Sequence, residues 1–141
     1  MNDIAAKTPW HLWVIGLVTL LWNAVGIWSY LSTQTGNLEG FGMSDEAIAY
    51  VTGFPAWAEA FWALGVWGAF VGSILILLRS RWAVLSLQIS VVGLIVTTIY
   101  QRGLTQMPED MAGMGIAVAI WVITLFTLWY AMKMRSEGVL R

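Results

Sequence analysis

The sequence predicts an all-α integral membrane protein: a four-helix bundle with both termini cytoplasmic and a short amphipathic helix in the first outer loop. Three observations lead to this fold class. The chain contains four long apolar runs. Only 11% of its 141 residues are charged, against about 25% in soluble proteins, and its mean hydropathy is +0.73. Its basic residues are unevenly distributed, which orients the bundle.

The four apolar runs have the length of membrane-spanning helices. They cover residues 12–31, 55–78, 82–100 and 113–131. A hydrocarbon core about 30 Å thick requires about 20 helical residues, whereas a barrel strand requires only about 9–11. The first run is longer than a secretory signal core and lacks a small-residue cleavage site, so we expect a true span. The connecting segments are too short for a second core, so residues 1–141 form one domain.

Basic residues orient the predicted bundle. If the chain crosses the membrane four times, six of the seven lie on the same side of it and only Arg102 lies on the other. Since short loops rich in Lys and Arg stay in the cytoplasm, we expect both termini and the turn at Ser80 inside. The inner side then has a net charge of +4 and the outer side −5. The six inner bases are Lys7, Arg79, Arg81, Lys133, Arg135 and Arg141.

The first outer loop, residues 32–54, contains a helix signal of its own. Ser44 can cap a helix N-terminus, and Asp45 and Glu46 suit the positive end of its dipole. A weak apolar face follows, and Gly53 ends the segment before the second span. We therefore expect a short amphipathic helix at the outer interface.

Small residues on the second and third spans predict close helix packing. The connection around Ser80 is short, so these two spans form an antiparallel hairpin. Small side chains let two backbones approach closely in a membrane. We expect them to pack the bundle itself; the alternative is a homodimer through Gly68 and Gly72. The predicted packing residues are Gly65, Gly68, Gly72, Ser86, Ser90 and Gly93.

Glu59 is the first candidate for a binding or proton-carrying site. It lies one turn inside the second span, close to Trp62, where an ionised carboxylate is costly. An intramembrane carboxylate is a functional hypothesis by default. The alternative is structural, because Glu59 can favour the helix N-terminus or pair with Arg102.

Asn23 and Gln88 are the other strongly polar side chains at membrane depth. Interhelical hydrogen bonds average about 0.6 kcal/mol in membranes, so helix packing is their default role. Alternatively, they join Glu59 and Trp62 in a site reached from the outer face. A sparse polar seam would include the hydroxyl residues Thr19, Ser90, Thr97 and Thr98.

The remaining residues offer no support for enzyme chemistry. The absence of cysteine removes disulfides, thiolate nucleophiles and iron–sulfur ligation. His11 is the single histidine, so it cannot supply paired axial haem ligands. Met107, Met111 and Met114 form a cluster that favours loop anchoring over soft-metal binding. We expect no enzyme activity, no metal, no cofactor and no nucleic-acid partner.

Several short segments carry a family resemblance. They are the runs around Leu21-Trp22-Asn23, Phe54-Pro55-Ala56-Trp57 and Arg81-Trp82-Ala83-Val84. In these, the chain resembles a family of small four-span bacterial inner-membrane proteins of uncharacterised function, some of which carry an automatic sugar-transporter label. The resemblance implies a multi-pass protein of the bacterial inner membrane. It supplies no functional residues.

The function expected from these features is a non-enzymatic one. We expect an accessory or interaction subunit of a larger membrane complex, or a homo-oligomer, in contact with membrane lipid. The alternative is a small carrier of a small solute, with an outer-facing site around Glu59. A third possibility is a protein that handles a quinone or lipid through its tryptophans.

Overall fold

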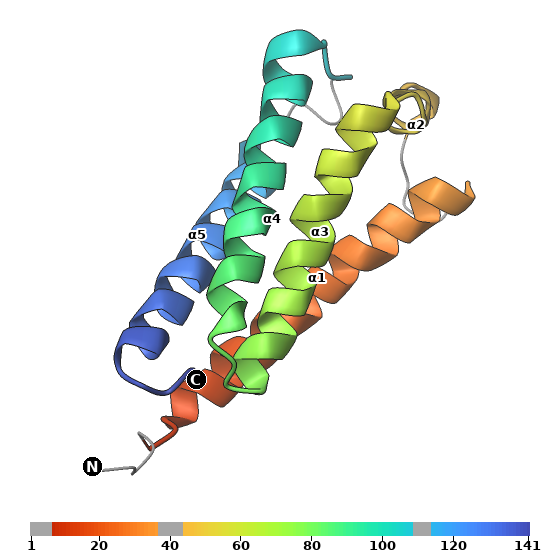
Figure 1. Cartoon of the computed structure of the whole chain (residues 1–141). Coiled ribbons are helices and arrows are strands. Elements are labelled where there is room, and N and C mark those ends of the chain that lie inside the picture. The colour runs from red at the N-terminus through yellow and green to blue at the C-terminus, as the bar shows by residue number, and fades with distance from the viewer. Residues whose placement is uncertain (1–6, 37–43, 109–113) are drawn as a thin grey trace.

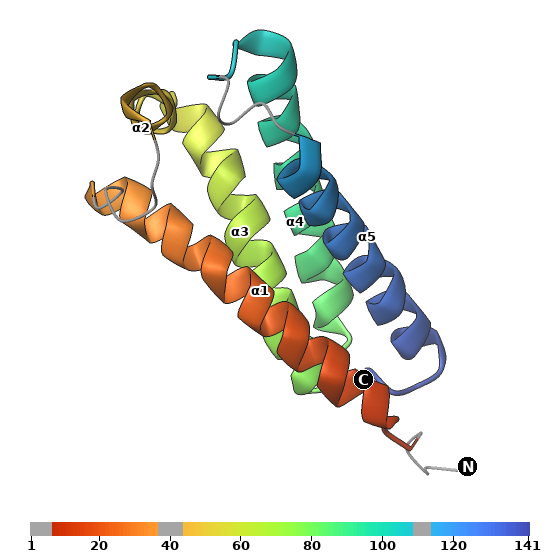
Figure 2. The same cartoon turned by 180° about the vertical axis from the view of Figure 1, so that it is seen from behind.

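A computed structural model of the chain describes residues 7–36, 44–108 and 114–141 (Figures 1 and 2). This described part is all-helical, without a strand. Four of its helices are long and apolar enough to cross a membrane. They are α1 (Trp10–Thr35), α3 (Ala56–Leu77), α4 (Trp82–Ile99) and α5 (Met114–Ser136), with the short α2 (Asp45–Thr52) between α1 and α3.

Two of the long helices run well beyond their predicted spans of 12–31 and 113–131. The last turn of α1 is polar, yet Thr33 and Thr35 donate their hydroxyls to carbonyls four residues earlier, and Gly36 ends the helix with φ 78°. α5 continues to Ser136, and Gly138 follows it with φ 78°. Hydropathy marks the apolar core of a helix, whereas capping glycines mark its end.

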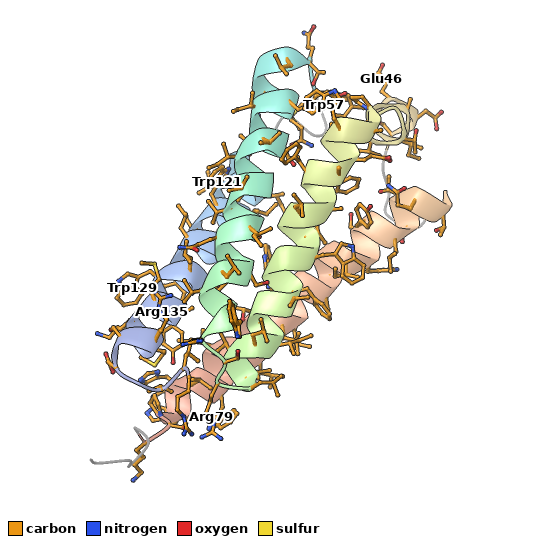
Figure 3. The ribbon with its side chains drawn as sticks, viewed as in Figure 1. Glu46, Trp57, Arg79, Trp121, Trp129 and Arg135 are labelled. Carbon is orange, nitrogen blue, oxygen red and sulfur yellow. The ribbon has the colours of Figure 1, made fainter. Side chains whose placement is uncertain are left out.

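The helices α1, α3, α4 and α5 run up and down, so the beginning of α1 and the end of α5 lie at the same end of the bundle (Figure 1). Arg79 links these segments, because its guanidinium donates to Thr8 Oγ1 at 3.1 Å and its carbonyl accepts from the Arg141 N–H at 2.8 Å. We call the end of the bundle where α1 begins and α5 ends the terminal end, and the opposite end the distal end. Figure 3 shows Arg79 and Arg135 there, and Glu46 at the opposite, distal end. The acidic residues Asp3, Glu39, Glu109 and Asp110 lie outside the described residues.

The α3–α4 hairpin is the most closely packed part of the bundle. A Cβ atom on Gly93 would lie 2.5 Å from both Gly65 N and Phe61 O, so only glycine fits. Ser90 Oγ donates to Gly65 O at 2.6 Å, and Ser86 Oγ donates to Gly68 O at 2.7 Å. Each serine thus adds a hydrogen bond where small size already permits close approach.

This packing occupies the surface considered above for a homodimer. A Cβ atom on Gly68 would lie 3.0 Å from Ser86 O, and one on Gly72 would lie 2.7 Å from Leu87 Cγ. Both contacts are made by α4 of the same chain. The glycine face of α3 is therefore covered within the monomer.

One buried cluster of side chains lies at each end of the bundle. At the terminal end, residues of α1, α3, α4 and α5 pack with the C-terminal Val139 and Leu140. At the distal end, α2 packs over α3 and the end of α4 through Val51, Phe54 and Tyr100. One π-helical turn, Tyr100–Leu104, extends α4 there, so this span does not continue as a regular α-helix.

Substitution of Gly93 tests the closeness of the hairpin. Gly93→Ala would press a methyl group into the α3 backbone, and overpacking of this kind costs about 1–3 kcal/mol. We expect a clear loss of thermal stability in mild detergent. Gly115→Ala is the matched control, because nothing lies within 4 Å of a Cβ at Gly115. Equal stability of the two variants would contradict the contact.

Candidate functional site

A cavity of about 390 Å³ lies among α1, α3, α4 and α5. Its volume falls within the range of about 300–1,000 Å³ that small-molecule sites occupy. Of the residues that the structure describes, no charged one lines it. Its wall combines Trp22, Trp62 and aliphatic side chains with neutral polar residues. The polar residues are Asn23, Ser29, Ser90, Thr97, Thr98, Gln101 and Thr124.

The cavity exists because α1 and α5 meet only near the terminal end. There the His11 Nδ1 atom lies 2.6 Å from the Tyr130 hydroxyl, beside the buried side chain of Leu12. Towards the distal end, α1 leans away from α5 (Figure 2). Both helices still line the cavity, but their side chains Val25 and Ile116 are 58% and 68% exposed. The rim between α1 and α5 is thus apolar and open.

A chain of hydrogen bonds on the terminal side of the cavity joins α1 to α3. The Asn23 amide nitrogen donates to Ser73 Oγ at 2.9 Å and to Ala69 O at 3.1 Å. Ser73 Oγ can donate in turn to Thr19 Oγ1 at 3.1 Å, and Thr19 donates to Ile15 O at 2.7 Å. Both N–H groups of Asn23 are therefore used, while its carbonyl oxygen has no hydrogen bond among the described residues.

Further polar groups are available to a ligand. The side chains of Ser29, Gln101 and Thr124 make no hydrogen bond within residues 7–36, 44–108 and 114–141. Yet no buried side-chain nitrogen or oxygen in those residues lacks a partner. The polar atoms of these three side chains are therefore not fully buried and are accessible to a ligand. Together they offer hydroxyl and amide donors as well as acceptors.

Aromatic contacts hold the wall of the cavity at its distal end. The Trp62 ring packs edge-on against Tyr30 with centroids 5.0 Å apart and lies 5.6 Å from Phe54. On the other side, the Trp121 indole N–H donates to Thr98 Oγ1 at 3.2 Å, linking α5 to α4. These contacts fix the side chains around the cavity.

The structure brings together only half of the site residues predicted from the sequence. Asn23 and Trp62 line the cavity, with two of the packing residues, Gly65 and Ser90. Glu59 lies near the distal end of α3, outside the lining, where it accepts a hydrogen bond from the Gln34 amide at 2.9 Å. Gln88 is exposed on α4 and does not line the cavity.

The cavity lining includes part of the expected polar seam, together with residues that the sequence did not indicate. Ser90, Thr97 and Thr98 of the expected polar seam line the cavity, whereas Thr19 lies on its terminal side. Gln101 and Thr124 were not considered. The four-residue spacing of Ile116, Ile120 and Thr124 is the signal that could have marked one face of α5. Met111 lies outside the described residues, so the methionine cluster is not placed.

A tyrosine hydrogen bond ties α2 to the end of α4. The hydroxyls of Tyr50 and Thr105 are hydrogen-bonded to each other. Burial of the phenol raises the pKa of Tyr50 above its ordinary value of 10.0, although the hydrogen bond to Thr105 opposes this. The phenol is therefore neutral at physiological pH and can donate in this contact.

Comparisons with protein-family models, curated proteins and solved structures found no match to this chain. The resemblance to the four-span bacterial family therefore remains a prediction from the sequence.

Replacement of Ser73 tests the hydrogen-bond chain on the terminal side of the cavity. Ser73→Ala removes the acceptor of one Asn23 N–H, and interhelical hydrogen bonds in membranes are worth about 0.6 kcal/mol on average and up to about 1.7. We expect a loss of this size in unfolding free energy in mixed micelles. Ser29→Ala, which removes no internal hydrogen bond, should leave it unchanged. An equal effect of the two substitutions would exclude the network.

Proposed function

We propose that the chain is a non-enzymatic membrane protein that works as an assembled subunit, with a second copy of itself as the partner, paired through α4. The observation that carries the proposal is Gln88. Its amide lies on the exposed face of α4 without a hydrogen bond among the described residues. Interhelical hydrogen bonds of polar side chains in membranes are worth about 0.6 kcal/mol on average and up to about 1.7. A partner that hydrogen-bonds this amide is therefore favoured over lipid, which offers no such bond.

The residues around Gln88 favour a helix as that partner. Residues with the alternating three- and four-residue spacing of a coiled-coil seam lie on this face, all of them exposed. The four apolar members are branched aliphatic side chains, and Gln88 is the single polar one. Such a seam buries apolar side chains against an equivalent helix, with one polar residue to set the register. Its members are Leu85, Gln88, Val92, Ile95 and Ile99.

Membrane geometry favours a copy of the same chain. Two copies inserted in the same orientation are parallel, so a two-fold axis along the membrane normal brings Gln88 opposite Gln88. The same axis places both amides at the same depth in the membrane. That depth is about 9 Å along the helix from Trp82, which lies six residues before Gln88. Each amide can donate to and accept from the other.

The proposed orientation places the terminal end in the cytoplasm of a bacterium, with the chain in the inner membrane. Arg81 lies 5.4 Å from the centroid of the Trp82 ring and Lys133 lies 5.7 Å from that of Trp129. Paired aromatic and basic side chains of this kind suit the headgroup region. At the distal end, Ser44 accepts from the Ala47 N–H and begins α2, which we place at the outer interface.

A carrier of a small solute is a second candidate function. The specific observation in its favour is the cavity, which contains Asn23 and Trp62. Glu59 would have to act from outside the cavity lining. Uptake into vesicles that is abolished by both Asn23→Leu and Glu59→Gln would support this function over self-assembly.

Introduced cysteines test the pairing directly, because the chain has none of its own. We expect Gln88→Cys and Val92→Cys to form disulfide-linked dimers on oxidation in membranes. Val71→Cys is the matched control, since Val71 is an exposed residue of α3 away from the seam. Gln88→Leu should raise the dimer dissociation constant about 3- to 20-fold, the equivalent of about 0.6–1.7 kcal/mol.

Two outcomes would contradict this proposal. One is equal crosslinking at positions 71 and 88, which would indicate random collision. The other is purification in mild detergent as a stoichiometric complex with a different protein that protects Gln88→Cys from modification.

A further inference from the structure

We infer that the cavity binds an uncharged amphiphile from the bilayer, a neutral lipid with a hydroxyl-bearing headgroup, whose apolar chain leaves between α1 and α5. This inference goes beyond self-assembly and does not depend on it. It uses the cavity of the second candidate function, but it requires no transport.

The lining sets the charge of the ligand. Of the described residues, none that lines the cavity is Asp, Glu, Lys, Arg or His. A charged headgroup would therefore be buried without a counter-ion, which is strongly unfavourable. Hydroxyl and amide groups on the ligand, in contrast, find matching partners. The open polar groups are the Asn23 carbonyl oxygen and the side chains of Ser29, Gln101 and Thr124.

The open polar groups come from three helices and occupy different depths. On α1, Ser29 lies six residues beyond Asn23, about 9 Å nearer the distal end. Gln101 approaches from the end of α4, and Thr124 from the middle of α5. A headgroup with several oxygen atoms can therefore bind more than one wall at once. A simple hydrocarbon would leave all these groups unsatisfied.

The position of the opening between α1 and α5 determines how a ligand enters the cavity. The hydrogen bond between His11 and Tyr130, together with the buried cluster around it, closes the terminal end. The gap between α1 and α5 is flanked by the exposed apolar side chains of Val25 and Ile116, which contact lipid in a membrane. A ligand that enters through this gap must pass an apolar rim to reach a polar interior. An amphiphile with its head inside and its chain in the rim satisfies both surfaces.

Water alone is the simplest competing occupant. Polar cavities of sufficient size hold ordered water, and empty cavities are apolar. Two tryptophans and several aliphatic residues share the wall with the polar groups, however, and water gains little from them. The mixture of aromatic, aliphatic and neutral polar lining favours an amphiphilic ligand.

Gly26 allows the cavity to be filled without disturbing the bundle. A Cβ atom there would meet only Val66 Cγ1, at 3.9 Å, and Gly26 lines the cavity. The Gly26→Leu substitution places a side chain in the cavity and also introduces a better helix former. The matched control is Gly115→Leu, which adds the same side chain to α5 where nothing lies within 4 Å of the Cβ.

The experiment uses the full chain in lipid vesicles and a monoacylglycerol with a photoreactive group in its acyl chain. We expect Gly26→Leu to reduce photolabelling at least tenfold, with wild-type labelling in Gly115→Leu. Unlabelled monoacylglycerol should compete, whereas an ionised fatty acid with the same chain and free glycerol should not. A Ser29→Ala/Thr124→Val double variant, which loses no internal hydrogen bond, should label several-fold less with unchanged thermal stability.

Three results would overturn the inference. Undiminished labelling of Gly26→Leu would place the lipid elsewhere on the surface. Competition by the fatty acid would show that the headgroup is not recognised, and competition by glycerol alone would indicate a water-soluble ligand. Gln88→Leu should label like the wild type, so failure of the pairing and failure of lipid binding are distinguishable.

Discussion

Hydrocarbon offers no hydrogen-bond partner, and this constraint governs both the backbone and the few polar side chains of the chain. The backbone meets it by forming helices. The hydroxyls of the hairpin meet it by donating to carbonyls of the neighbouring helix, as Ser86 and Ser90 do to α3. Because these serines and Gly93 bring α3 and α4 together so closely, the hairpin forms the centre of the bundle. α1 then packs on α3 and α5 on α4, which leaves a space between α1 and α5.

The same constraint separates the two amides at membrane depth into different roles. The Asn23 amide nitrogen donates to Ser73 and Ala69, and Asn23 lines the cavity. Gln88 is exposed on the opposite side of the hairpin and has no partner among the described residues. One amide thus lies at the cavity and the other on the outer surface of the bundle. The proposed lipid binding and the proposed pairing therefore use different surfaces of the chain.

The apolar runs of the sequence were sufficient to predict four long helices, since length and composition alone define such segments. They were not sufficient to tell which way each helix faces. All four spans are apolar on nearly every side, so the sequence pattern could not tell whether Asn23 or Gln88 faces the interior of the bundle. Hydropathy did not predict the polar last turn of α1, because its threonine hydroxyls donate hydrogen bonds to backbone carbonyls of the same helix. The cavity depends on the divergence of α1 from α5, which no local pattern encodes.

Four crossings with the terminal end in the cytoplasm are tested most directly by single cysteines at Ser136 and Gln106. Both are exposed, and they lie at the terminal and distal ends respectively. In intact cells whose periplasm is accessible, a maleimide that cannot cross lipid should label Gln106→Cys alone. Ser136→Cys should react only after the cells are broken. Labelling of Ser136→Cys in intact cells, or of both positions equally, would contradict the proposed membrane orientation.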